Sequence, residues 1–202
     1  MGTPSFTRLD VDERRRRLLE VGARAFTERS YDEVSMNDLA RAAGISKGLL
    51  YHYFPSKRDL FTATLAAAAG ELAAVTAPDP SLPPAEQLSR SVTAYLAWIE
   101  DNADGYRRLL ESAGSQDVRD LIEDVRERTV DQIVAGVTGG NPRPALRVAV
   151  RAWLWGMDGA ILDWLDRGDV TRDQVRDLLV ATFAGALAAA TQVDPEVTLA
   201  LG

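Results

Sequence analysis

The chain has 202 residues, of which 46% are hydrophobic and 26% are charged, a composition typical of folded globular proteins and too apolar for intrinsic disorder. Cysteine is absent and the only histidine is His52, which excludes disulfides, thiol nucleophiles and multi-histidine metal sites. We therefore expect no metal site, no cofactor and no catalytic group built on these residues.

The net charge of −7 is unevenly distributed. Residues 1–60 carry 11 basic and 9 acidic side chains, whereas residues 61–202 carry 12 basic and 21 acidic ones. An acidic chain argues against nucleic acid as a partner, so only the mildly basic first segment favours one. No apolar run approaches the roughly 20 residues of a membrane-spanning helix, and the first twenty residues are charged. These features predict a soluble, cytoplasmic protein that has no membrane partner.

Hydrophobic periodicity predicts helices and no strands, and therefore an all-α fold. A capping box that begins at Asp10 predicts a first helix over about 11–29. A second capping box begins at Ser35 and precedes a helix of about two turns, which Gly44 ends as a left-handed residue.

The next two helices are separated by a proline. Ser46 can cap a third helix, which ends near Phe54 because Pro55 disfavours helical geometry in the residue before it. Ser56 can cap a fourth helix that continues to about residue 77.

Four prolines between residues 78 and 84 mark the clearest break in the chain. Beyond it we expect five further helices, which brings the total to nine, at 84–102, 104–113, 116–136, 144–167 and 172–191. These elements predict three parts: an N-terminal domain at 1–55, a linking helix at 56–77, and a larger C-terminal helical domain at 78–202.

Segment 35–57 is the most informative part of the chain. Two short helices separated by a glycine-containing turn are the pattern of a helix-turn-helix. In this motif the first helix crosses the DNA backbone and the second enters the major groove. On a helical wheel of that second helix, Leu50 and Phe54 share one face. The opposite face carries polar groups and a glycine, namely Lys47, Gly48, Tyr51 and His52.

The same segment resembles the TetR family of bacterial transcriptional regulators. The resemblance covers residues 10–70 closely, and the remainder only in length and number of helices. It departs at Leu49, where the family often carries threonine or another small residue. The matching motifs are Leu39-Ala40-Arg41-Ala42-Ala43-Gly44, Ser46-Lys47-Gly48, Leu50-Tyr51-His52-Tyr53-Phe54 and Ser56-Lys57.

The resemblance implies specific contacts with DNA. Lys47 is suited to the O6 and N7 atoms of guanine, whereas Tyr51 and Lys57 are suited to phosphates. Leu49 either meets a thymine methyl group or turns inward. Simpler roles remain open, because serines cap helices and His52 is also explained as an ordinary solvated residue. The candidate DNA-binding residues are Ser35, Ser46, Lys47, Gly48, Leu49, Tyr51, His52 and Lys57.

The helix predicted at 144–167 has two apolar stripes, one through Trp153 and Met157 and the other through Trp155. A helix that is apolar on two faces is covered on two sides. The resemblance implies that this helix and the one at 172–191 pair with a second subunit, which gives a homodimer. It also implies a pocket for a small, mainly apolar effector, although aromatic stripes are equally explained by core packing. The candidate ligand-binding residues are Trp98, Tyr106, Leu110, Trp153 and Met157.

The resemblance implies that the domain at 1–55 binds DNA and that the domain at 78–202 binds the ligand and dimerises. These features together predict a ligand-responsive transcriptional regulator without enzymatic activity. We expect a repressor that binds a near-palindromic double-stranded operator and is released by the effector. Two alternatives stay open: an all-α enzyme or small-molecule carrier whose helix-turn-helix is only structural, and a DNA-binding protein without a ligand.

Overall fold

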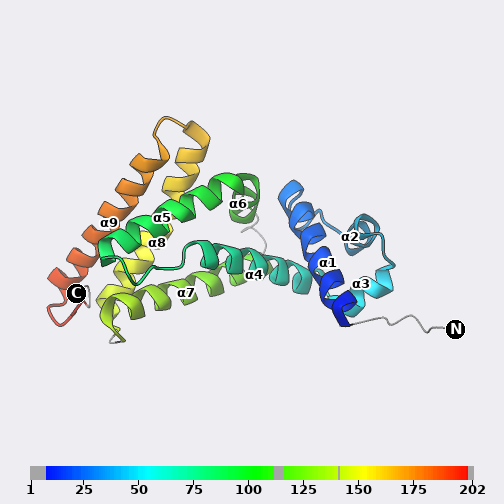
Figure 1. The fold of residues 1–202 in the computed structure, drawn as a ribbon, viewed down its shortest axis with the longest axis horizontal. Helices are drawn as coiled ribbons and strands as arrows, with labels where there is room; N and C mark the ends of the chain where they lie inside the picture. The colour runs from blue at the N-terminus through cyan, green and yellow to red at the C-terminus, as the bar shows by residue number, and fades with distance from the viewer. Residues whose placement is uncertain (1–7, 112–115, 141, 200–202) are drawn as a thin grey trace. The chain divides into compact units, whose positions relative to one another are not determined.

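The computed structural model describes residues 8–111, 116–140 and 142–199. Over these ranges the chain forms nine α-helices and no β-strand, which confirms the all-α prediction (Figure 1). No helix in the described ranges combines the length and apolar character that a membrane crossing requires. The same ranges contain no group of three or more aspartate, glutamate or histidine side chains placed to hold a metal ion.

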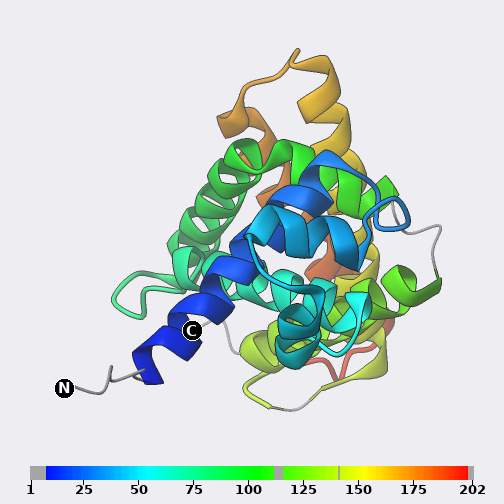
Figure 2. The same cartoon turned by 90° about the vertical axis from the view of Figure 1, so that its right-hand side faces the viewer.

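The helices divide into two compact units. The first unit comprises the described residues up to Glu71 together with those between Asp104 and Arg119. Its helices are α1 (Arg8–Glu28), α2 (Met36–Ala43), α3 (Lys47–Tyr53), most of α4 (Lys57–Val75) and nearly all of α6 (Ala103–Glu111). Within it, α2 packs against both α1 and α3 (Figures 1 and 2).

Helix α1 begins at Arg8, three residues before the predicted start at residue 11. The prediction that Asp10 caps this helix was therefore wrong, because Asp10 lies inside the first turn. Acidic residues are favoured in a first turn by the helix macrodipole, so the same sequence pattern arises there without capping.

Aromatic packing fixes α4 against α1 in the first unit. The ring of Phe61 on α4 lies edge-on to Phe26 of α1, with 4.8 Å between centroids, and 4.9 Å from Tyr31. Gly22 of α1 faces α4 so closely that a Cβ atom there would lie 2.9 Å from Oγ1 of Thr64. The first unit therefore has a tightly packed core of its own.

The second unit holds the described residues between Leu72 and Ala103 and those from Asp120 onward. Its helices are α5 (Pro84–Asp101), most of α7 (Gln116–Thr138), α8 (Pro144–Arg167) and α9 (Arg172–Val193). Helix α9 packs against both α8 and α5 (Figure 1). Ion pairs from Arg126 to Asp158 and from Arg151 to Glu123 connect α7 to α8.

Besides α6, whose first residue Ala103 belongs to the second unit, two helices are divided between the units. The last residues of α4, from Leu72, belong to the second unit, and the first residues of α7, up to Arg119, belong to the first. The predicted helix ends otherwise lie within about three residues of those observed, and the last two residues predicted for the helix at 104–113 lie outside the described residues.

Candidate nucleic-acid interface

Helices α2 and α3 form a helix-turn-helix whose ends are capped as the sequence predicts. Ser35 accepts a hydrogen bond from the backbone N–H of Asp38, at 3.2 Å. Ser46 accepts one from the backbone N–H of Leu49, also at 3.2 Å. Each such cap is worth about 1 kcal/mol, so the two serines stabilise these short helices.

Gly44 makes the turn between them. Its φ of 69° is left-handed, a conformation that costs glycine little and other residues more. Its N–H donates to the carbonyl of Arg41 and that of Ile45 donates to the carbonyl of Ala40, which satisfies the last carbonyls of α2. The glycine predicted to end this helix therefore has that role.

Helix α3 has one buried face and one exposed face. Leu50 is 1% exposed and Phe54, its C-cap, is 2% exposed, so both anchor the helix in the core of the first unit. Leu49 and Tyr53 are half-buried at the boundary. Lys47, Gly48, Tyr51 and His52 are all exposed, as the helical wheel predicts.

The exposed face combines a cation with aromatic rings. The ammonium nitrogen of Lys47 lies 5.7 Å from the centroid of the Tyr51 ring, within the range of a cation–π contact. His52 lies edge-on to Tyr53, with 5.7 Å between ring centroids. A Cβ atom added at Gly48 would meet nothing within 4 Å. The face thus offers one charge, hydrogen-bonding groups on two aromatic side chains, and open space beside the backbone.

Ser35 and Lys57 both have partners within the protein. The hydroxyl of Ser35 donates to the carboxylate of Asp38 at 2.6 Å while accepting the cap hydrogen bond. Lys57 is half-buried, and its ammonium donates to the carbonyl of Tyr31 at 2.8 Å and lies 4.3 Å from the centroid of that ring. Because an ammonium has three N–H donors, this contact leaves donors for a phosphate.

Arginines in and beside the motif contact its residues. The guanidinium carbon of Arg15 lies 5.3 Å from the centroid of the Phe54 ring, so α1 places a charge beside the end of α3. The sequence shows this arginine only as part of a basic run, since no local spacing predicts a contact across 39 residues. Arg29 and Arg41 form ion pairs with Asp38. The pKa of Asp38 is lowered, mainly by the hydrogen bond from Ser35 and to a smaller extent by these two positive charges.

The structure distributes the five candidate ligand-binding residues over both units. Tyr106 and Leu110 are half-buried on α6 in the first unit, whereas the other three lie in the second. Trp153 donates its indole N–H to the carbonyl of Leu179 at 3.1 Å, and its ring lies 4.7 Å from that of Phe183. Trp153 therefore contributes to the packing of α8 on α9. Trp98 on α5 is half-buried, and Met157 on α8 is buried. A ligand contact at these five positions stays a prediction.

Comparisons with known proteins identify both parts of the chain. The family model of bacterial regulatory proteins of the tetR family matches residues 18–64, and the model of the tetracyclin repressor-like C-terminal domain matches residues 84–186. The chain is 34% identical over 107 residues to the transcriptional activator FasR of Mycolicibacterium smegmatis, covering 52% of this chain and 49% of that protein. It is 31% identical over 147 residues to the repressor KstR2 of Mycobacterium tuberculosis, covering 68% and 74%.

The chain spans about half the length of FasR, the first of these relatives. A solved structure is similar over a larger share of the chain. The crystal structure of a tetR-family transcriptional regulator from Streptomyces coelicolor aligns with a TM-score of 0.75 and 32% identity, covering 98% of this chain and 86% of that one. The match of both family models and this agreement in fold show that the chain belongs to the TetR family of bacterial regulatory proteins.

Proposed function

We propose that this protein is a ligand-responsive transcriptional repressor that binds a near-palindromic operator as a homodimer. The observation that carries the DNA-binding step is the exposed face of α3, where Lys47, Tyr51 and His52 are presented by a helix capped and anchored in a core. The proposed arrangement is a DNA-binding domain at 1–55, the linking helix at 56–77 and a regulatory domain at 78–202. The proposed site of action is the bacterial chromosome, and so the cytoplasm.

The proposed DNA contacts are those expected from the sequence. Lys47 contacts the edge of a base, and Tyr51 and Lys57 bind phosphates. The remaining candidates contact base edges in the major groove or the phosphates beside it. Repression rather than activation is favoured because the named repressor KstR2 is matched over 74% of its length, against 49% for the activator FasR.

A mobility-shift experiment with genomic fragments tests DNA binding directly. The protein should slow the migration of a small subset of fragments, and the triple variant Lys47→Ala/Tyr51→Ala/His52→Ala should slow none. Retention of no fragment by the unaltered protein would favour the alternative of an all-α enzyme or carrier with a structural helix-turn-helix.

The exposed surface of α8 and α9 carries large apolar side chains, which supports the proposed dimer. Val148 is 59% exposed, Trp155 51% and Leu178 55%, so covering these side chains would remove apolar area from water. The ring of Trp155 also lies 5.5 Å from the guanidinium carbon of Arg126 and 5.4 Å from that of Arg151. We propose that the corresponding surface of a second copy covers this one, as the apolar stripes in the sequence predict.

A glycine on this surface allows a specific test. Gly185 of α9 is exposed, and a Cβ atom there would meet nothing within 4 Å, so the Gly185→Arg variant should fold. In the dimer the arginine would bury an unpaired charge, and the variant should therefore sediment as a monomer. Gly136→Arg, at an equally open glycine of α7, should remain a dimer. Dimers of both variants at micromolar concentration would contradict the proposed interface.

The proposed regulation is a shift between two conformations. An effector in the regulatory domain would favour a dimer whose recognition helices no longer match the half-site spacing, which requires that it bind the two states with different affinities. Because the four tryptophans all lie between residues 98 and 164, a bound effector should quench their fluorescence over the concentration range that weakens operator binding. Saturating operator should then weaken effector binding by the same factor. If a compound quenches the fluorescence but leaves operator affinity unchanged, the protein binds that compound and the proposed regulation is contradicted.

A further inference from the structure

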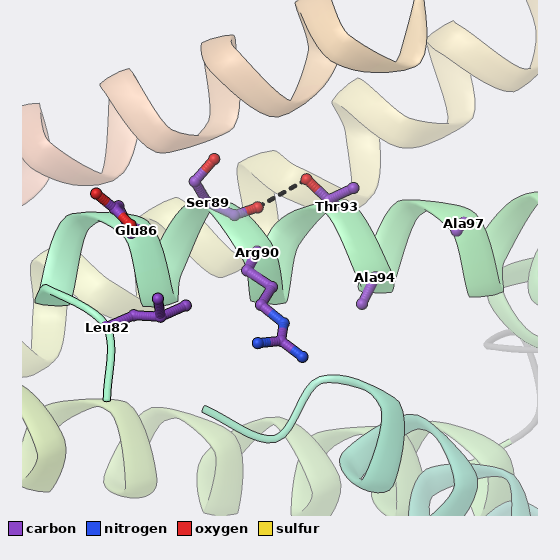
Figure 3. Close-up of a pocket in the computed structure, with 7 residues that line it drawn as sticks. All are labelled: Leu82, Glu86, Ser89, Arg90, Thr93, Ala94 and Ala97. Atoms are coloured by element: carbon purple, nitrogen blue, oxygen red, sulfur yellow. Dashed lines mark hydrogen bonds between the residues drawn. The ribbon is translucent and has the colours of Figure 1, made fainter. Parts of the chain in front are cut away.

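A groove of about 480 Å³ runs along one side of α5 (Figure 3). The groove is shallow and open to solvent, so a ligand bound there would keep part of its surface in water. Every residue that lines it lies on α5 or, in the case of Leu82, in the loop before that helix, so the groove belongs to the second unit alone. None of the five ligand-binding candidates from the sequence lines it.

One edge of the groove carries oxygen atoms. Glu86, Ser89 and Thr93 are spaced by three and four residues, which aligns them along the helix, and Figure 3 shows all three side chains on the same edge. The Thr93 hydroxyl donates to the Ser89 carbonyl at 2.8 Å, so its oxygen can still accept a hydrogen bond. Among the described residues, the Glu86 carboxylate and Ser89 hydroxyl have no hydrogen-bond or ion-pair partner. This edge therefore presents acceptors to a ligand.

The one cation that lines the groove is already paired. Arg90 donates from Nη1 to the Asp79 carboxylate at 2.7 Å. Asp79 also accepts hydrogen bonds from the hydroxyl of Ser81, at 2.6 Å, and from its backbone N–H, at 3.1 Å. These bonds, together with Arg90, lower the pKa of Asp79 and keep its carboxylate ionised. The charge of Arg90 is thus compensated, whereas that of Glu86 is not, which leaves the groove with an excess negative charge.

The remaining surface is apolar and small. Leu82 lies on the edge opposite the oxygen atoms in Figure 3, and Ala94 and Ala97 continue along the helix. Because alanine extends only one carbon from the backbone, these two positions leave space that a larger side chain would occupy. A ligand can therefore place a hydrophobic group here beside the oxygen-bearing edge.

We propose that this groove binds a protonated amine that carries a hydrophobic group. The ammonium donates to the carboxylate of Glu86 and to the hydroxyl oxygens of Ser89 and Thr93, and the hydrophobic group lies against Leu82 and the two alanines. An alcohol of the same shape keeps the hydrogen bonds but loses the charge attraction, and a carboxylate is repelled by Glu86. If the proposed regulation holds, such an amine is the effector. Binding of the amine to the groove can be measured whether or not it changes DNA binding.

Three naphthalene derivatives of similar size test the ligand class with the full chain in the absence of DNA. Equilibrium dialysis at pH 7 should rank their affinities as 1-naphthylmethylamine, then 1-naphthalenemethanol, then 1-naphthoate. Glu86→Gln should lower the affinity for the amine about two- to fivefold, the effect of an exposed ion pair, and leave that for the alcohol unchanged. Asp131→Asn, at an exposed carboxylate of α7 outside the groove, should change neither affinity.

A groove-filling variant tests the location. Ala97→Trp should abolish binding of the amine and the alcohol, with circular dichroism and thermal unfolding confirming that the variant is folded. Equal or tighter binding of 1-naphthoate, or unchanged amine affinity in Glu86→Gln, would overturn the proposed ligand class. Retained amine binding in a folded Ala97→Trp variant would overturn the location. If the amine binds as predicted but operator affinity stays constant, the proposed effector response fails while the groove assignment stands.

Discussion

Lys57 has a contact with Tyr31 and a proposed contact with DNA, whose effects separate measurements of stability and of DNA binding can distinguish. Its ammonium donates to the Tyr31 carbonyl at 2.8 Å and lies 4.3 Å from the Tyr31 ring, while its position at the start of α4 suits it to a DNA phosphate. Replacement by alanine should therefore reduce both stability and DNA affinity. Replacement by methionine retains the hydrocarbon stem against the ring and removes only the charge and the hydrogen bond.

The two contacts of Lys57 with Tyr31 determine the expected loss of stability. A hydrogen bond that involves a charged group contributes about 1.5–3 kcal/mol and an exposed cation–π contact about 0.5–1 kcal/mol. Because Lys57 is only half-buried, we expect Lys57→Ala to lower the free energy of unfolding by about 1–2 kcal/mol. For a chain of this length, that loss lowers Tm by about 2–8 °C.

The DNA effect appears in the salt dependence of binding. Loss of one phosphate contact per subunit should reduce the log–log salt slope by about 2 per dimer and weaken all sequences about equally. Fluorescence anisotropy with operator and scrambled duplexes across a salt series measures both quantities, and calorimetry gives Tm. Arg24→Ala, at an exposed arginine of α1, is the control and should change neither. An unchanged Tm in Lys57→Ala would refute the Tyr31 contact as a stabilising interaction, and an unchanged slope would refute the phosphate contact.

Two further predictions concern stability alone. Gly22→Ala should be about 0–2 kcal/mol less stable, because its Cβ would lie 2.9 Å from Oγ1 of Thr64. Gly70→Ala, where a Cβ would meet nothing within 4 Å, should be more stable by up to about 1 kcal/mol. If urea unfolding shows the two variants stabilised equally, the close packing of α1 on α4 is contradicted. Hydrogen bonds from Arg143 and from the backbone of residue 196 lower the pKa of Asp194, so its contribution to stability is present above the ordinary aspartate pKa of about 3.9 and is lost as pH falls through the lowered value. Asp194→Asn should therefore be less stable than the unaltered protein at pH 7, and the difference should shrink as the pH falls below about 3.9. A difference in urea midpoints that stays constant down to pH 2 would argue against the ion pair.

The fold was predictable because its signals are local. Serine caps, the turn at Gly44 and the proline after Phe54 fix the ends of α2 and α3 through contacts within a few residues. Apolar periodicity likewise predicts which side of each helix is buried. The start of α1 was mispredicted because Asp10 suits both a cap and a first turn, and local sequence does not distinguish the two.

The site was predictable only where its chemistry is local. The exposed face of α3 follows from the spacing of its residues, whereas the contacts of Lys57 with Tyr31 and of Arg15 with Phe54 join residues 26 and 39 positions apart. The paired state of Arg90, which determines the charge of the groove on α5, depends on a bond to Asp79 across a loop. Such contacts require the packed structure, because residue type and spacing alone do not specify them.

The most direct test of the account is the effect of Lys47→Ala on operator and scrambled duplexes, with the operator chosen by selection from a random pool. If the exposed face of α3 reads bases, the variant should lose about 1–3 kcal/mol per half-site on the selected operator, lose little on the scrambled duplex, and accept other bases at one position. An equal loss on both duplexes would mean that Lys47 binds only phosphate. Unchanged affinity on every duplex would contradict DNA recognition by α3.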